Sequence, residues 1–497
     1  MTDSTTKADW VIRGALVYDG ISREPTVFDV AIMSDRIVAI GPDLPAASRE
    51  VAAAGLCLAP GFVDVHSHDD FVLFLDPHLP FKALQGVTTE IVGNCGIGPA
   101  PSSGSRPWME RFHPGAVFPE FLDTFGYIAA VDEAAPALNI AVLAGHGSLR
   151  EAAAPGSRGA LSRVEQVKLE ALYEEAVAAG VVGLSSGLIY EPGCHADEAE
   201  LIALLRRGRE MAPLYTTHLR NEADHLLLAV EEAIRIADAA GVGLQLSHHK
   251  AHGRNNWGRV KDSLALVDRA LERGLDVALD VYPYTAGSTI LSAIVEGLGG
   301  SSRLGKLDPE DVVVATMSGH EELEGSNLAD LMRRWSVSKE EAAAEVLRLD
   351  PGAWVIIHAM SEDDVETVIR HPRTLFGSDG IPTTAGRPHP RLYGTFPRVL
   401  GHYTRERGLL VLGETIRRLT SVAAARFGLV DRGAIRPGAF ADLVLFDAAS
   451  VLDQATYEDP RRPPPGIEAV WVNGRRVVEG GRHTGERPGR ALRRGVS

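Results

Sequence analysis

The stretch EEAVAAGVVGLSSGL, residues 174–188, decides the fold class of this chain. Its first half has the composition of a helix and ends in Gly180, which can supply the left-handed residue that terminates a helix. An apolar run follows at once. The same unit recurs as ADAAGVGLQLSHHK at 237–250 and as LERGLDVALDVY at 271–282. Because helices that alternate with apolar strands imply parallel pairing through helical crossovers, the repetition predicts an α/β fold.

Nine apolar runs between residues 62 and 379 are candidate strands of that fold. A (β/α)8 barrel of the TIM type needs eight, so one run is surplus. We expect the surplus run to be WVIIHAM at 354–360, because it follows a polar, helix-rich interval that breaks the repeat. That interval, at about 286–352, is predicted to be an insertion after the seventh strand. The expected barrel strands are FVDVH (62–66), TTEIVGNC (88–95), NIAVLAGH (139–146), VVGLSSGL (181–188), LYTTHL (214–219), GLQLSHH (243–249), DVALDVY (276–282) and TLFGSD (374–379).

Both ends of the chain have the character of short strands instead. WVIRGALVYDG (10–20), VFDVAIMSD (27–35) and RIVAIGPD (36–43) carry β-branched residues and turn-forming breaks, and strand character returns after about residue 430. Asn473-Gly474 lies between two apolar runs and is typical of a two-residue hairpin turn. We therefore expect a small β-sandwich domain built from residues 1–60 and 425–497, beside a catalytic barrel over 61–424.

One segment of the expected barrel has the composition of a loop. Residues 98–115, GPAPSSGSRPWMERFHPG, are rich in proline, serine and glycine. We expect a long loop over one face of the barrel, serving either as a lid or as a plain connection.

Composition excludes several classes of protein. The chain has 497 residues, of which 45% are hydrophobic and 23% charged, so it can bury large cores. Its formal net charge of −16 disfavours nucleic acid and anionic membranes as partners. Three cysteines cannot form a disulfide framework, and MTDSTTKADW has no signal-peptide pattern. The expectation is a cytoplasmic protein with a small-molecule substrate, as a monomer or small homo-oligomer.

Residues able to bind a metal stand at the ends of five of the expected barrel strands. The carboxyl ends of barrel strands meet at one mouth, which is where barrel active sites are built. An isolated His-x-His pair could equally be two surface histidines. Because residues able to bind a metal recur at the ends of five strands, the alternative that they are ordinary core or surface residues is weakened. The candidates are His66 and His68 in FVDVHSHDD, Cys95 in IVGNCG, His218 in LYTTHL, His248 and His249 in GLQLSHH, and Asp379 in TLFGSDG.

Imidazole nitrogen together with a thiolate is a donor set that suits Zn²⁺. Cys95, between Asn94 and Gly96, is interpreted as a thiolate ligand, whereas Cys57 and Cys194 are interpreted as small buried hydrophobes. Asp379 is the best candidate for a general base that takes a proton from a metal-bound water. The alternative for Asp379 is an N-cap of a following helix.

Cations and hydroxyls that follow the same strand ends are candidates for contact with a carboxylate of the substrate. They are Lys250, Arg220, Tyr282, Ser288 and Arg391. Each alone would more commonly be a surface charge or a structural hydrogen-bonding residue. The sequence has neither a GxSxG elbow nor a phosphate-binding loop, so no serine-based site competes with the metal site.

Motifs along the whole chain resemble the N-acyl-D-amino-acid deacylase (D-aminoacylase) family of the amidohydrolase superfamily. The most specific feature is the combination of the motifs NCG, HHK and GSDG. The resemblance continues through the C-terminal tail, which begins with GAIRPGAFADLVLFD at 433–447. The other matching motifs are APGFVDVHSHDD (59–70), GVTTEIVGNCGIGPAP (86–101), SSGLIYEPG (185–193), HLRNE (218–222), DVYPYTAGST (280–289) and HPRLYGTFPRVL (389–400).

The resemblance implies roles for individual residues. A tightly held zinc would be bound by Cys95, His218 and His248. A second, weaker site would share Cys95 with His66 and His68. Asp379 would be the catalytic acid and base. Relatives that hydrolyse cyclic amides bridge two metals with a carboxylated lysine on the fourth strand, but VVGLSSGL has no lysine, which favours the cysteine-bridged type. The remaining implied site residues are His66 and His68 on the second metal, Lys250, Tyr282 and Ser288 on the substrate carboxylate, Tyr190 near the same pocket, and Arg391 as a further carry-over.

The implied reaction is zinc-dependent hydrolysis of N-acyl-D-amino acids to a carboxylate and a D-amino acid. The preference for the D configuration comes only from the resemblance. Two alternatives stay open at this point: a D-specific deacylase or peptidase that acts on small peptides or lipopeptides, and a non-catalytic homologue that holds zinc for structure. Ile189 beside Tyr190, together with the insertion, would shape the pocket.

Overall fold

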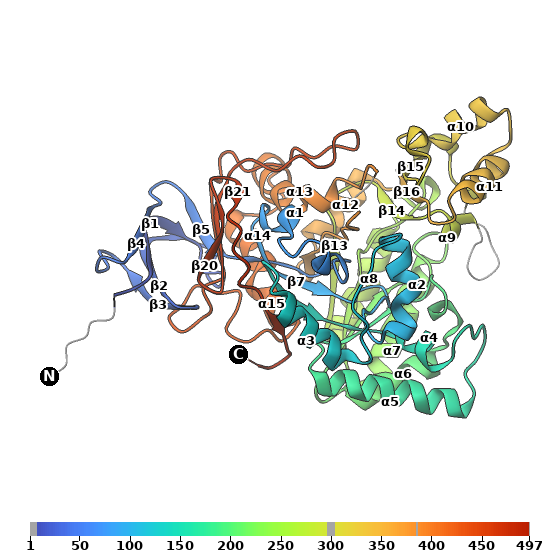
Figure 1. Cartoon of the computed structure of the whole chain (residues 1–497), viewed down its shortest axis with the longest axis horizontal. Coiled ribbons are helices and arrows are strands. Elements are labelled where there is room, and N and C mark those ends of the chain that lie inside the picture. The colour runs from blue at the N-terminus through green and yellow to red at the C-terminus, as the bar shows by residue number, and fades with distance from the viewer. Residues whose placement is uncertain (1–6, 296–303, 384–385, 497) are drawn as a thin grey trace.

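The barrel and the sheet built from both chain ends lie side by side in the computed structural model, which describes residues 7–295, 304–383 and 386–496 (Figure 1). The strands of the two chain ends form one end of the molecule, and the insertion forms the opposite end (Figure 1). The predicted α/β fold, a (β/α)8 barrel with a small β-sandwich domain, is confirmed.

Eight parallel strands form the barrel. The third position is shared by two short strands in direct succession, and the ring closes where the Asp379 amide donates to the His66 carbonyl at 2.7 Å. Ser67 and Gly380 form a parallel bridge at the same seam. The strands are β6 (Phe62–Asp64), β7 (Val87–Val92), β8 (Asn139–Val142) with β9 (Ala144–Gly145), β10 (Leu184–Gly187), β11 (Leu214–His218), β12 (Gly243–Leu246), β13 (Val277–Val281) and β17 (Thr374–Phe376).

The helices between these strands end where the glycines predict. Gly180 and Gly241 are C-caps in the left-handed region, with φ of 98° and 74°, because only glycine adopts this conformation without steric cost. The crossover helices are α1 (Pro80–Ala83), α3 (Thr124–Ala134), α4 (His146–Ala153), α5 (Arg163–Ala179), α6 (Glu198–Gly208), α7 (Leu226–Ala240), α8 (Val260–Glu272) and α12 (Glu362–Arg370). After β17 follow α13 (Arg391–Arg398), a π-helical segment (Val399–Glu406), α14 (Leu412–Leu419) and α15 (Ser421–Arg426).

The chain ends meet in a mixed sheet. Its core includes Trp10 and Trp471, whose rings pack edge to face with centroids 6.0 Å apart. Asn473 and Gly474 both have positive φ, 46° and 76°, and form the predicted hairpin turn. The strands are β1 (Trp10–Val17), β2 (Thr26–Met33), β3 (Arg36–Gly41), β4 (Arg49–Ala52), β5 (Cys57–Pro60), β18 (Leu443–Phe446), β19 (Ile467–Val472), β20 (Arg475–Glu479) and β21 (Arg482–His483).

The last described strand, β22 (Ala491–Leu492), leaves this sheet and pairs in parallel with β8 of the barrel. The C-terminal residues therefore tie the two parts of the molecule together. The domain boundaries at 60/61 and 424/425 stay a prediction.

The insertion contains its own small sheet and core. β14 (Gly287–Ile290), β15 (Val312–Thr316) and β16 (Trp354–Ile357) pair antiparallel, with α9 (Ser292–Val295), α10 (Leu328–Trp335) and α11 (Lys339–Leu349) packed around them. The surplus run WVIIHAM supplies β16, so it lies outside the barrel as expected. This small sheet extends past residue 352 to Ile357.

The expectation of a loop at 98–115 is wrong, because α2 occupies Ser102–Phe112. Trp108, Met109 and Phe112 on this helix are buried against the barrel. Their packing outweighs the poor helix propensity of the glycine, serine and proline around them, because tertiary burial routinely overrides propensity. Among the described helices, none has the length and apolar character to cross a bilayer.

Candidate metal centre and substrate pocket

The predicted donors converge at the carboxyl mouth of the barrel. Cys95 Sγ lies 3.4 Å from His66 Nε2, 3.6 Å from His218 Nδ1 and 3.4 Å from His248 Nε2. A tetrahedral zinc with Zn–S of about 2.3 Å and Zn–N of about 2.0–2.1 Å separates its sulfur and nitrogen ligands by about 3.6 Å. The spacing of Cys95, His218 and His248 therefore fits one zinc ion.

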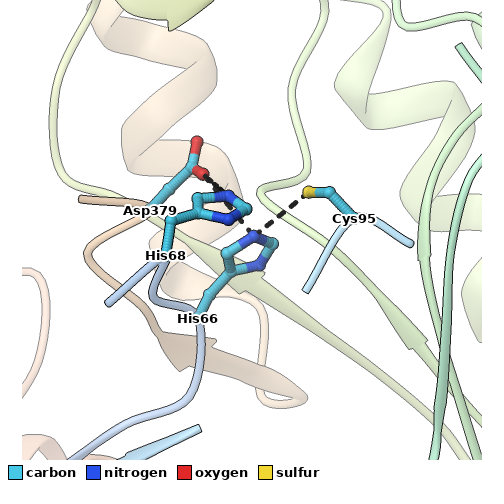
Figure 2. Close-up of side chains that lie close together, drawn as sticks. All are labelled: His66, His68, Cys95 and Asp379. Atoms are coloured by element: carbon cyan, nitrogen blue, oxygen red, sulfur yellow. Dashed lines mark hydrogen bonds and ion pairs between the residues drawn. The ribbon is translucent and has the colours of Figure 1, made fainter. Parts of the chain in front are cut away.

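A second group of donors shares the same thiol. His68 Nε2 lies 3.2 Å from Asp379 Oδ1, and His66 Nε2 lies 3.5 Å from that oxygen (Figure 2). Donor atoms of His66, His68, Cys95 and Asp379 all lie within 4.8 Å of one another, as do those of Cys95, His218 and His248. In Figure 2 the two rings lie between the carboxylate and the thiol. We call the six residues of these two groups the donor cluster.

A left-handed backbone conformation positions three members of the donor cluster. Cys95, His248 and Asp379 have φ of 55°, 35° and 48°, in the left-handed region. Residues other than Gly, Asn and Asp rarely adopt it, so the backbone is strained at Cys95 and His248. Each lies two or three residues past the end of a strand, at β7, β12 and β17. The chain turns sharply there, and the turn places the side chain over the mouth.

The donor cluster pairs two acidic groups, the Cys95 thiol and the Asp379 carboxyl, with imidazoles. Burial would raise the pKa of the Cys95 thiol, but the imidazoles of His66 and His248 outweigh burial and hold this pKa well below its usual value. Burial would likewise raise the pKa of Asp379, but Arg391 and the histidines hold it well below its usual value. The same pairing raises the pKa of His66 well above its usual value and that of His68 to about 9, so these rings would have to release protons when a metal binds.

The candidate substrate contacts gather around Tyr282. Lys250 Nζ lies 5.6 Å and the Arg391 guanidinium carbon 4.5 Å from the centroid of the Tyr282 ring. Arg391 is 1% exposed, and its Nη1 lies 2.8 Å from Asp379 Oδ2. Its Nε and Nη2 have no hydrogen-bond partner among the residues that the structure describes. Ser288, on β14, lines a pocket above the donor cluster together with Lys250 and Tyr282.

Three other candidates differ in placement. The Tyr190 ring packs edge-on at 5.0 Å from the His218 ring, so Tyr190 lies beside the metal donors. Arg220 does not reach the pocket wall, because Glu232 and the carbonyls of Cys194 and Ala196 bind its guanidinium. His249 turns away from the mouth and pairs with Ser263 at 2.8 Å, so it stays outside the donor cluster.

The sequence of this chain is similar to those of known amidohydrolases along almost its whole length. The profile of the Amidohydrolase family matches residues 49–294 and 239–478. The chain is 41% identical over 495 residues to an N-acyl-D-glutamate deacylase of Alcaligenes xylosoxydans xylosoxydans, covering 99% of this chain and 98% of the relative. It is 39% identical over 492 residues to a D-aminoacylase of the same organism, covering 98% of each. The chain belongs to the D-aminoacylase family of amidohydrolases.

A solved structure adds the chemistry of the D-aminoacylase family. The N-acyl-D-glutamate deacylase of Bordetella bronchiseptica, crystallised with zinc and a phosphonate mimic of the tetrahedral intermediate, is 40% identical with a TM-score of 0.89. The match covers 98% of this chain and 100% of that one. The predicted family and the class of metal-dependent amidohydrolase are confirmed. The roles of individual residues stay predictions.

Glu222 is a residue of this D-aminoacylase-family site that sequence reasoning did not single out. Its Oε1 lies 3.0 Å from His248 Nδ1 and 2.6 Å from Lys250 Nζ, and its Oε2 lies 3.5 Å from His218 Nε2. A carboxylate on the outer nitrogen of a ligating histidine fixes its tautomer and its orientation. Burial would raise the pKa of Glu222, but Lys250 and the histidines hold it well below its usual value. The only signal in the sequence is its position four residues after His218.

Asp280 was missed in the same way. Its Oδ1 lies 3.2 Å from His66 Nδ1 and accepts a 2.7 Å hydrogen bond from the His248 amide. It lies inside the strand β13, where an alternating pattern gives no sign that histidines at the ends of other strands contact it.

A pocket opens above the donor cluster, between the barrel mouth and the insertion. One part of its wall is polar and includes Lys250, Tyr282 and Ser288. The rest is apolar and comes from α2, from the loops after β7, β10 and β17, and from the insertion. The apolar lining residues are Ile97, Trp108, Phe112, Ile189, Ile290, Ile294, Leu307, Trp354, Ile357 and Ile381.

Proposed function

We propose that this protein hydrolyses the amide bond of N-acyl-D-amino acids with zinc, giving a carboxylate and a free D-amino acid. One observation carries the proposal: an ionised carboxylate, Asp379, lies against a cysteine–histidine donor set that has zinc spacing. The full-length similarity to N-acyl-D-glutamate deacylase and D-aminoacylase supports the substrate class and its handedness.

Cys95, His218 and His248 would hold the tight zinc, and His66, His68 and Cys95 a second, weaker one. Bound zinc supplies a Lewis acid for the amide carbonyl and lowers the pKa of a coordinated water towards about 7. Because Cys95 belongs to both groups, its sulfur is the natural bridge between the two positions.

Asp379 would move the proton. Arg391 holds one carboxylate oxygen, Oδ2, at 2.8 Å, so the other oxygen, Oδ1, faces the donor cluster. A carboxylate in this position can accept the proton of the attacking water and return it to the departing amine nitrogen. Arg391 thus keeps Asp379 ionised before the reaction and orients it.

The carboxylate of the substrate would bind at the polar wall around Tyr282. Arg391 offers buried N–H groups without a hydrogen-bond partner among the described residues, and a buried unpaired donor is costly until a ligand satisfies it. Lys250 adds a second cation, which Glu222 orients, and Ser288 adds a hydroxyl. A fork of this kind suits a planar carboxylate.

The test is Asp379→Asn with a panel of N-acetyl D- and L-amino acids. The variant should keep its fold and its zinc, and its kcat should fall by at least about 10³-fold because the proton carrier is lost. Asp268→Asn is the matched control, because Asp268 also pairs with a histidine, His371, but lies on α8 away from the mouth. Unchanged turnover in Asp379→Asn would support the non-catalytic alternative, and cleavage of D-peptides without cleavage of acetyl-D-amino acids would support the peptidase alternative.

A further inference from the structure

We infer that Ser185, on β10, is a positioning residue of the metal centre. Its hydroxyl holds the turn that carries Cys95, and so it fixes where the shared sulfur lies relative to the histidines. The inference deepens the proposed function and rests on one part of it, the assignment of Cys95 to zinc. Ser185 acts through the backbone on both sides of Cys95 and is not itself a metal ligand.

The turn that carries Cys95 has little stiffness of its own. It covers residues 93–96, directly after β7, and we call it the Cys95 turn. Three of its four residues have positive φ: 82° at Gly93, 55° at Cys95 and 73° at Gly96. Glycine adopts such angles at no steric cost but leaves them as easily, because it has no side chain to restrict the backbone. The position of the Cys95 sulfur therefore depends on contacts that neighbouring elements make with the turn.

Ser185 makes two of these contacts with a single hydroxyl group. Its Oγ accepts a hydrogen bond from the Gly96 amide at 3.0 Å and donates one to the Gly93 carbonyl. These partners lie one residue after and two residues before Cys95, so the hydroxyl spans the residue that bears the sulfur. Ser185 is fully buried, and hydrogen bonds in such surroundings are stronger than those exposed to water.

The backbone of β10 also closes one side of the Cys95 turn. A Cβ atom at Gly187 would overlap the Cys95 carbonyl, and a Cβ atom at Gly96 would lie only 2.7 Å from the Gly187 amide nitrogen. The absence of a side chain at these two positions therefore lets the turn after β7 lie directly against β10. The Gly93 amide adds a further hold through a 2.6 Å hydrogen bond to Asp70 Oδ1.

This hold matters because the sulfur belongs to both groups of the donor cluster. It lies 3.4 Å from nitrogens of His66 and His248 and 3.6 Å from a nitrogen of His218. Distances between a metal and its ligands must stay within about 0.2 Å of their ideal values. A turn free to rotate about its glycines would displace the sulfur by more than this and weaken metal binding at both positions.

The test compares Ser185→Ala with Ser186→Ala, which alter neighbouring serines of the same strand. Ser186 is equally buried, and its hydroxyl shares hydrogen bonds with those of Tyr215 at 2.7 Å and Thr217 at 2.8 Å. Its side chain points to the opposite face of the strand, because successive residues of a strand alternate. Each variant loses a buried hydroxyl with two partners, so a general loss of stability would affect both alike. Only Ser185→Ala releases the Cys95 turn.

Two measurements report on the metal rather than on turnover. Competition with a chelator gives the zinc affinity, and the thiolate-to-metal charge-transfer band of the Co²⁺-loaded protein reports on the bond to Cys95. Ser185→Ala should bind zinc about 10–100-fold more weakly, as the loss of a group that orients a metal ligand does, and should shift or weaken the cobalt band. Ser186→Ala should keep the affinity and the band of the unaltered chain.

The outcomes separate this inference from the proposed function. Equal zinc affinities in the two variants, whether both are unchanged or both are weakened, overturn the role of Ser185. The proposed function then still stands if the unaltered chain binds zinc and cleaves acetyl-D-amino acids. An unaltered chain that binds no zinc and cleaves none of these substrates defeats the proposed function itself.

Hydrogen exchange on the unaltered chain decides the matter if Ser185→Ala does not fold. The hydrogen bonds of Ser185 to the Cys95 turn involve protein groups alone, so the Gly96 amide should exchange slowly with zinc bound and remain slow after a chelator removes it. Fast exchange at Gly96 in the zinc-free chain, while the amides of β7 stay protected, would show that the metal rather than Ser185 shapes the turn. That result would overturn the inference.

Discussion

Two clusters of buried polar side chains lie within the barrel, and they are built in opposite ways. In the first, Lys82 Nζ lies 2.7 Å from Asp64, 2.9 Å from Asp69 and 3.1 Å from Glu90, with the Ser378 hydroxyl at 3.0 Å. In the second, the donor cluster, thiol, imidazole and carboxylate groups point at a common centre. No lysine or arginine among the described residues occupies that centre; Arg391 approaches only the outer oxygen of Asp379.

The difference separates a structural cluster from a functional one. The Lys82 cluster contains its own cation, and the four charged side chains have no exposed surface. Burial and the neighbouring Asp69 carboxylate raise the pKa of Glu90 well above its usual value, so the cluster sheds excess negative charge by keeping a proton. The donor cluster instead holds its acidic thiol and carboxyl groups against imidazoles, whose protons a metal ion would displace.

Removing the shared sulfur should produce the largest effect. Cys95→Ala should bind zinc weakly and lose at least about 10³-fold in kcat, because the thiolate is a ligand of both groups. Zinc content and kcat measured on the same preparation check this. Cys57→Ala is the control, because Cys57 is buried in β5 of the end sheet and should keep both zinc and turnover. Full zinc content in Cys95→Ala would contradict the assignment of the donor cluster as the metal site, and with it the contrast to the Lys82 cluster.

Removing the cation of the Lys82 cluster should lower the stability of the fold. Lys82→Met leaves buried carboxylates without a cation and should lower the free energy of unfolding by about 3–5 kcal/mol. Chemical denaturation measures this, with Lys261→Met, an exposed position on α8, as the control.

The pH dependence of that loss has a defined sign. Burial opposes the charge of Lys82, but the carboxylates outweigh burial and raise its pKa well above the usual value. The stabilisation is therefore complete below about pH 10, the pKa of lysine in an unfolded chain, and is lost only as the pH rises through the folded pKa. Lys82 also lowers the pKa of the buried Glu90, so its removal raises that pKa further, and the loss of stability in Lys82→Met should grow as the pH rises from about 6 to 9. A difference below about 1 kcal/mol would show that this cluster is no stronger than a surface ion pair.

The smallest effect should come from Glu222, which orients the donors without being one of them. Glu222→Gln should weaken zinc binding by about 10–100-fold, as the loss of a carboxylate behind a ligating histidine does. It should also raise KM, because Lys250 loses the partner that positions it. Competition with a chelator measures the first effect and steady-state kinetics the second. Glu232→Gln, which removes the partner of Arg220, should change neither value.

The parts of the molecule that could be predicted are those whose causes are local in the sequence. Gly180 and Gly241 end helices by their own conformational freedom, so the repeating unit of the barrel is visible in the chain. Cys95 and His218 were found because parallel strands bring their carboxyl ends to one mouth, whatever the details of packing.

The parts that could not be predicted depend on partners from distant elements. Glu222 matters because it meets Lys250 and His248, which lie on the loop after a different strand. Lys82 has the composition of a surface residue of a short helix, and only the folded barrel shows three carboxylates around it. The helix α2 was mistaken for a loop because its stability comes from the burial of aromatic side chains rather than from its propensity.

The left-handed backbone at Cys95, His248 and Asp379 has a practical consequence for engineering. Left-handed residues other than glycine cost of order 1 kcal/mol each, so glycine at Cys95 or His248 would relieve this backbone cost and at the same time remove a donor of the metal site. At Asp379 the gain would be outweighed, because the buried Arg391 would lose its carboxylate partner. Any programme that ranks substitutions by melting temperature alone will be drawn to Cys95 and His248 and should exclude them in advance.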